Sequence, residues 1–229
     1  MEGRGEKNPA RVRKLARGIS STQTNREGDK KVNNSTKTLP EGYVQSGEIN
    51  LKKNRRLAIA LNLIAVPVAA ISFFLLLFFA GLVRPSLMNS SGTITVGVWV
   101  VVLVLMLFTI HELIHGLFFW VFTRSRPVFA LRLFYAYAGA PDWYIPTRQF
   151  MIVALGPLVI IGVVGMLLML LVPESWVVLL VIMVAFNTGG SVGDLLVFTH
   201  LLKLSPTSLA NDTGDVMSFY EHPSTLSHP

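Results

Sequence analysis

The stretch Val96–Phe122, VGVWVVVLVLMLFTIHELIHGLFFWVF, decides the predicted fold class. It carries one carboxylate and no Lys or Arg, and it exceeds the length of about 20 apolar residues that a helix needs to cross a bilayer. Three further stretches have the same character: Leu57–Val83, Phe150–Val172 and Trp176–Leu202. We therefore expect an all-α membrane protein with four transmembrane helices.

The composition of the whole chain agrees with a membrane protein. Of its 229 residues, 52% are hydrophobic and only 14% are charged, whereas a soluble domain carries about a quarter charged residues. Residues 1–56 hold 14 Lys/Arg and 6 Asp/Glu, a net charge of +8, and the remaining chain has a net charge of −1. A basic arm beside an apolar segment favours anionic lipid, and not nucleic acid, as the partner.

The distribution of Lys and Arg predicts the orientation in the cell membrane, because cytoplasmic flanks are enriched in these residues. Four of them, Lys52, Lys53, Arg55 and Arg56, lie directly before the first apolar stretch. Four more lie in the 123–149 connection, and the two other connections hold only Arg84. We expect a multi-pass protein with both termini cytoplasmic. Its regions would be a disordered basic arm over 1–40, a four-span membrane domain over 41–205 and a polar cytoplasmic tail over 206–229.

The 123–149 connection has a pattern of its own. Apolar and aromatic residues alternate from Val128 to Tyr137, Ala138–Asp142 is typical of a turn, and Trp143–Ile145 could return as a second strand. This pattern predicts a short cytoplasmic β-hairpin between the second and third spans. An irregular interfacial loop with aromatic anchors fits the same residues equally well.

Ionisable side chains inside the apolar stretches mark the candidate site, since such groups are costly in lipid. His111, Glu112 and His115 form an HExxH motif. On a helix, positions i and i+4 lie on one face, so both imidazoles can bind one metal ion. Glu112 is offset by about 100° and reaches the side where a bound water would lie. The alternative is a buried hydrogen-bonded pair that serves packing alone.

Asp194 is the candidate third metal ligand. Counted from the expected cytoplasmic helix ends, His115 and Asp194 both lie about 10–12 Å deep, so antiparallel helices would bring them to one level. Asn187, Ser191 and Asp194 also follow the spacing i, i+4, i+7, which forms one polar stripe. Asn187 is a candidate helper for the oxyanion of the reaction.

These motifs together resemble a known family. HELIHG at 111–116, Gly156-Pro157 in the third span and NTGGSVGD at 187–194 are similar to the putative zincin peptidase family, which is distantly similar to site-2 proteases. The resemblance covers roughly residues 38–222. It implies that His111, His115 and Asp194 bind zinc and that Glu112 is the catalytic acid/base. One departure is Gly193-Asp194-Leu195, where site-2 proteases usually have Leu-Asp-Gly.

Two functions are compatible with this site. The first is a zinc metalloprotease that hydrolyses a peptide or membrane-protein substrate in or near the membrane, with Zn²⁺ lowering the pKa of a water and Glu112 accepting its proton. The second is a non-catalytic membrane protein that senses or carries metal with the same residues. Glu112 discriminates between them, because a sensor or carrier has no obligate need for a carboxylate beside the ligands.

Overall fold

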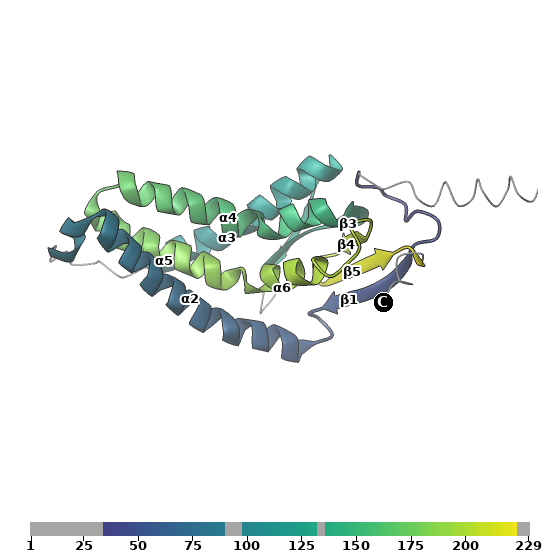
Figure 1. The fold of residues 1–229 in the computed structure, drawn as a ribbon, viewed down its shortest axis with the longest axis horizontal. Coiled ribbons are helices and arrows are strands. Elements are labelled where there is room, and N and C mark those ends of the chain that lie inside the picture. Colours follow the sequence, from purple (N-terminus) through teal and green to yellow (C-terminus); the bar gives the residue numbers. More distant parts are fainter. Residues whose placement is uncertain (1–33, 90–97, 132–135, 224–229) are drawn as a thin grey trace, which may run out of the picture.

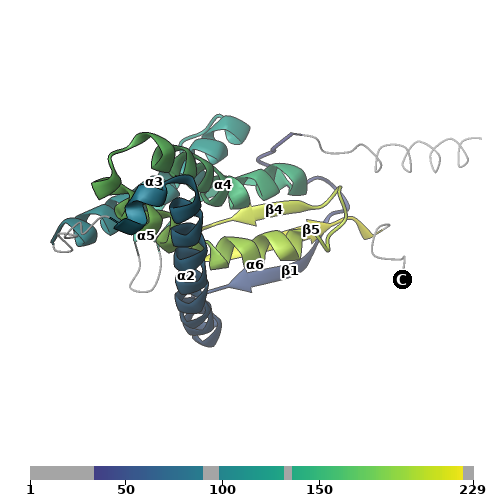
Figure 2. The same cartoon turned by 60° about the vertical axis from the view of Figure 1, so that its left-hand side comes forward.

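The computed structural model describes residues 34–89, 98–131 and 136–223. Helices lie side by side and a β-sheet covers one end of them (Figures 1 and 2). The elements in chain order are β1 (Val44–Asn50), α2 (Arg55–Val83), the 3₁₀ helix η1 (Pro85–Asn89), α3 (Val98–Thr123), β2 (Val128–Leu131), β3 (Ala136–Pro146), α4 (Thr147–Leu171), α5 (Glu174–Gly190), α6 (Val192–Leu201), β4 (Leu209–Asp212) and β5 (Val216–Glu221).

The expectation of an all-α protein with four transmembrane helices is wrong. The described residues form five α-helices and a five-stranded antiparallel sheet. Three helices, α2, α3 and α4, are long and apolar enough to cross a membrane. The stretch expected as the fourth span is instead two helices, α5 and α6, which are bent by 45° at Ser191 and could make a span only as a pair.

The sheet joins segments that are far apart in the sequence. Its strand order is β1-β5-β4-β3-β2, and every neighbouring pair is antiparallel. Strands β4 and β5 come from residues 209–221, within the region expected as a polar tail, and β1 comes from the segment just before α2. One continuous sheet therefore lies at the same end of the helices as the 123–149 connection.

The expected hairpin between the second and third spans is present as β2 and β3, but its turn is elsewhere. Residues 138–142, expected as the turn, lie inside β3. Strand β2 ends at Leu131 and β3 begins at Ala136, and the residues between them lie outside the described part. Gly139 explains the difference, because a side chain there would lie 3.1 Å from the Asp212 carbonyl and the Gly214 nitrogen. Close strand packing therefore uses small residues that are typical of turns.

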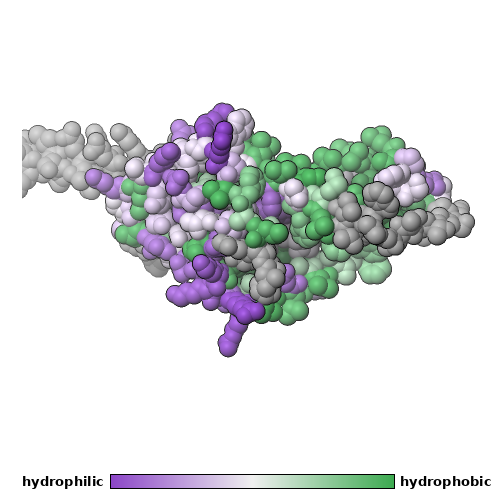
Figure 3. Space-filling model, turned by 180° about the vertical axis from the view of Figure 1, so that it is seen from behind, coloured by the Kyte–Doolittle hydropathy of each residue, from purple (hydrophilic) through white to green (hydrophobic). Residues whose placement is uncertain are grey.

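A buried cluster fixes the sheet to the helices. Ile145 and Phe219 of the sheet pack with Phe119 of α3, Phe150 of α4 and Leu201 of α6, and all five are at most 2% exposed. The outer faces of the helices are the opposite, with many large apolar side chains exposed. Hydrophobic residues gather over the helices and hydrophilic ones over the sheet end (Figure 3). Such a large exposed apolar surface indicates association with a membrane.

Candidate metal centre

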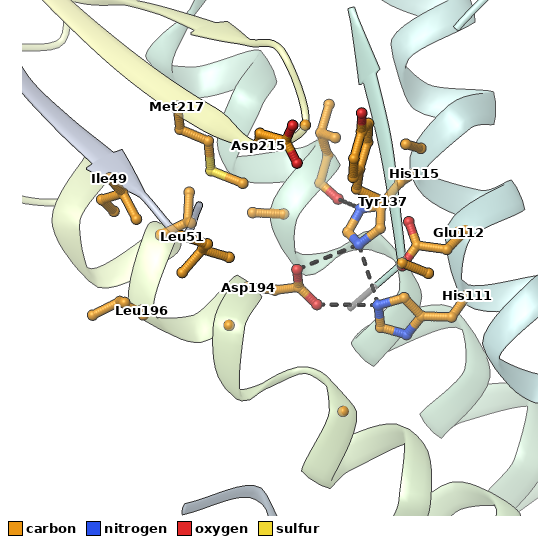
Figure 4. A pocket seen from close by; sticks show the side chains of 18 of the residues that line it. Ile49, Leu51, His111, Glu112, His115, Tyr137, Asp194, Leu196, Asp215 and Met217 are labelled. Atoms are coloured by element: carbon orange, nitrogen blue, oxygen red, sulfur yellow. Dashed lines mark hydrogen bonds and ion pairs between the residues drawn. The ribbon is translucent and has the colours of Figure 1, made fainter. Parts of the chain in front are cut away.

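His111, His115 and Asp194 come together in three dimensions (Figure 4). The two Nε2 atoms are 3.2 Å apart. Asp194 Oδ2 lies 3.2 Å from His111 Nε2, and Asp194 Oδ1 lies 3.4 Å from His115 Nε2. Among the described residues this is the group of His, Asp and Glu side chains with metal-binding spacing. Both histidines are buried.

The spacing of these donor atoms fits a zinc ion. Ligands at about 2.05 Å from a tetrahedral zinc ion are about 3.3 Å from one another. The two Nε2 atoms have this spacing, and each has a different oxygen of Asp194 at a similar distance. Two His nitrogens and one carboxylate oxygen are also a donor set that zinc uses when a further position stays open for catalysis. The arrangement is therefore compatible with a bound Zn²⁺.

The second nitrogen of each histidine has an acceptor, which fixes the tautomer. His111 Nδ1 donates to Asn187 Oδ1 at 3.0 Å, and His115 Nδ1 donates to the Val153 carbonyl at 2.9 Å. The Asn187 amide is oriented in turn, because its Nδ2 donates to the Pro157 carbonyl. With both protons on Nδ1, the two Nε2 lone pairs face each other and the carboxylate. Three electron-rich groups at this distance call for a cation between them.

Pro157 explains why the Val153 carbonyl is available. In a helix, the carbonyl of residue i−4 accepts from the N–H of residue i, and proline has no N–H. The carbonyl of Val153, four residues before Pro157 in α4, therefore lacks its usual partner within the helix. It accepts from His115 instead. The preceding Gly156 allows α3 to pack closely, since a side chain there would overlap the Phe118 ring at 2.4 Å.

Two residues on either side of the break between α5 and α6 contact the same imidazole, that of His111. Asn187 near the end of α5 contacts Nδ1 of His111, and Asp194 in the first turn of α6 contacts Nε2. Ser191 lies at the break, where its Oγ donates to the Asn187 carbonyl. The predicted polar stripe therefore holds His111 from both sides.

Glu112 lies beside the metal cluster without taking part in it. Its carboxylate accepts a hydrogen bond from the backbone of Ala138 in β3. It also lines a cavity of about 160 Å³ between the cluster and the sheet, shown in Figure 4. A carboxylate held next to the ligands and open to a cavity is suited to accept a proton from a water there.

Asp212 is a buried carboxyl group near the site that the sequence did not single out. It is 3% exposed, and its Oδ1 accepts from the Gly214 N–H at 2.6 Å in the tight β4–β5 connection. Burial raises the pKa of Asp212 to about 7. The signal that could have found it is weak, because Asp212 lies in a segment of ordinary polar composition.

This geometry defines a class of site. Two histidines one helical turn apart, a third acidic ligand and an adjacent glutamate are typical of zincin-type metalloenzymes. The model of the putative zincin peptidase family matches residues 104–209, which include the whole cluster and Glu112. The match confirms the resemblance drawn from the sequence, suggests a metallopeptidase and implies zinc. A similarity to site-2 proteases is not shown. No match was found among curated proteins or among solved structures.

Proposed function

We propose that this protein is a zinc metallopeptidase that cleaves peptide bonds in or beside a membrane. The observation that carries the proposal is the position of Glu112, a carboxylate next to a His–His–Asp cluster and facing a cavity. His111, His115 and Asp194 would hold the zinc ion. Zinc, when bound, would supply Lewis acidity that activates water and polarises a carbonyl.

The chain's own residues account for the proton transfers. Glu112 accepts a proton from the attacking water as the oxygen bonds to the peptide carbonyl carbon, and it then gives this proton to the leaving amine as the C–N bond breaks. Asn187 keeps the proton of His111 on Nδ1, so that Nε2 remains a ligand. Because both atoms of the Asn187 amide have partners within the protein, we assign it this orienting role in place of the oxyanion contact expected from the sequence.

The membrane assignment has support from the sheet. The segment before α2, the 123–149 connection and residues 209–221 were all expected in the cytoplasm from the Lys/Arg distribution, and they share one sheet. Such a sheet requires all three segments on one side of the bilayer. The lipid bilayer would therefore surround α2, α3, α4 and the bent α5–α6 pair, which returns the chain to the side of the sheet, and the active site would lie near the cytoplasmic face.

The alternative function, a membrane metal sensor or carrier without catalysis, uses the same three ligands. It leaves the position of Glu112 without a purpose. Transporters also commonly contain two related halves, and the sequence has no internal repeat.

Glu112→Gln separates the two functions. The variant keeps the size of the side chain but cannot accept a proton from water. We expect it to retain zinc while peptide hydrolysis falls by at least about 100-fold, as measured with the purified chain in detergent. Bound metal is counted in parallel by mass spectrometry. Hydrolysis at the wild-type rate in this variant would exclude Glu112 as the general base and with it the proposed mechanism.

A further inference from the structure

Two cavities meet at the candidate metal centre. The first is the cavity of about 160 Å³ between the cluster and the sheet. The second has a volume of about 350 Å³ and lies along α2, where α3 and the α5–α6 pair complete its walls. Leu51, Leu61, His111, Glu112 and Gly193 line both. A chain lying through both cavities would therefore pass directly beside Glu112.

The two cavities reach different parts of the molecule. The cavity along α2 has a rim of exposed apolar side chains: Val66 is 68% exposed, Phe108 43% and Phe186 44%. The helices that line it form the hydrophobic half of the surface (Figure 3). The other cavity ends against the sheet, where Tyr137 and Asp215 are polar groups in a lining that is otherwise mostly apolar, with Ile49, Leu51 and Met217 (Figure 4). The pair of cavities thus extends from the helices to the sheet.

Gly193 lies where the cavities join, and the fold does not explain why it is glycine. A Cβ built on Gly193 meets no atom within 4 Å, and its φ is not positive. Gly193 is the second residue of α6, so its helical position does not require a glycine either. Space is thus kept open beside Asp194, which is expected where a ligand backbone approaches closely.

We propose that the two cavities form one binding passage for an extended substrate peptide, and that Gly193 determines its specificity by keeping the junction open. The substrate class is a polypeptide whose residues are apolar on one side of the cleaved bond and polar on the other, such as the end of a membrane-spanning segment. The apolar residues lie along α2 and the polar residues lie at the sheet. The inference rests on the proposed peptidase function.

The first test fills the junction in the full, zinc-loaded chain in detergent. Two synthetic peptides of the same composition, made of Leu, Ala, Ser and Lys, serve as probes. In the segregated peptide one half holds the apolar residues and the other half the polar residues. In the mixed peptide apolar and polar residues alternate. We expect wild type to cleave the segregated peptide with a kcat/KM at least about tenfold higher. Gly193→Leu should lose this cleavage by at least about tenfold while retaining zinc.

Gly162→Leu is the matched control. Gly162 lies in α4, its Cβ would also meet no atom within 4 Å, and it lines neither cavity. The control should cleave both peptides as wild type does. Equal cleavage of the two peptides by wild type would refute the passage while leaving the peptidase function intact. Loss of cleavage in Gly162→Leu to the same extent as in Gly193→Leu would also refute it.

A second test does not depend on hydrolysis. The chain has no cysteine, so Gly193→Cys and Gly162→Cys each introduce one unique thiol. In a Glu112→Gln background, the segregated peptide should slow alkylation of Gly193→Cys by a maleimide at least about tenfold, and should not affect Gly162→Cys. If wild type cleaves neither peptide but this protection is seen, the peptidase function fails and the passage stands. Absence of protection overturns the passage.

Discussion

Pro157→Ala tests whether a proline in α4 prepares the metal centre. Proline leaves the Val153 carbonyl without a helical donor, and that carbonyl accepts from His115 Nδ1 at 2.9 Å. Alanine restores an N–H four residues after Val153, directed at the same oxygen. The substitution changes no ligand and keeps the Pro157 carbonyl that accepts from Asn187, so the expected effect on zinc binding comes from the Val153 carbonyl.

The structure sets the size and the sign of two effects. The new N–H competes for an oxygen with two lone pairs, so His115 loses at most one hydrogen bond, which is worth about 0.5–1.5 kcal/mol. Zinc binding should therefore weaken about two- to tenfold, since 1.4 kcal/mol corresponds to a factor of ten. The metal-free protein should become more stable, because proline inside a helix costs about 3 kcal/mol relative to alanine. A variant that binds zinc more weakly but is more stable without metal cannot be explained by a general loss of folding.

Zinc affinity is measured by titration against a competing chelator, and stability by thermal unfolding of the metal-free protein in detergent. Pro67→Ala is the matched control, because Pro67 also lies inside a helix, α2, which contributes no ligand. The control should gain stability and bind zinc as wild type does. Unchanged zinc affinity in Pro157→Ala, or equal weakening in Pro67→Ala, would refute the role of the free carbonyl.

Three further outcomes follow from the same geometry. Asp194→Ala should lose zinc as well as activity, seen as absent bound metal after purification, in contrast to Glu112→Gln. In the metal-free protein, Asp212→Asn should be more stable than wild type at pH 8 and lose this advantage by pH 4. Because burial raises the pKa of Asp212 to about 7, wild type loses stability as the pH rises toward 7, and thermal scans across this range measure it. Single cysteines at Ser125 and Ser175 should react with an impermeant maleimide from opposite sides of the membrane.

The metal cluster could be predicted from the sequence because its determinants are local. The HExxH spacing places two imidazoles on one face of α3 whatever the rest of the fold does. The approach of Asp194 followed from residue counts alone, since helices that cross a bilayer are confined to one direction and depth becomes a count of residues. The structure places Asp194 within 3.4 Å of both histidines, as the depth argument expects.

Beyond the β2–β3 hairpin, the sheet could not be predicted because its other pairings are not local. Strand β1 begins at Val44 and pairs there with Glu221, so no short window of sequence contains both partners. Strand β4 has only four residues, too few for alternation to be recognised. The apolar stretches dominated the composition, and the short strands between them had the length and polarity of loops. A fold class read from hydropathy therefore missed the part of the protein that contacts Glu112.

The break at Ser191 shows how an irregularity hidden in an apolar stretch can serve the site. In a straight helix, Asn187 and Asp194 would be about 10.5 Å apart along the axis. The imidazole of His111 must be reached by both, at 3.0 Å from one nitrogen and 3.2 Å from the other. The helices α5 and α6 meet at 45°, and one of the two side chains reaches His111 from each side of this break. The glycines before the break, which suggest a packing seam when read from the sequence, also permit this bend. Asn187 and Asp194, the two residues in contact with His111, therefore lie on opposite sides of one backbone feature.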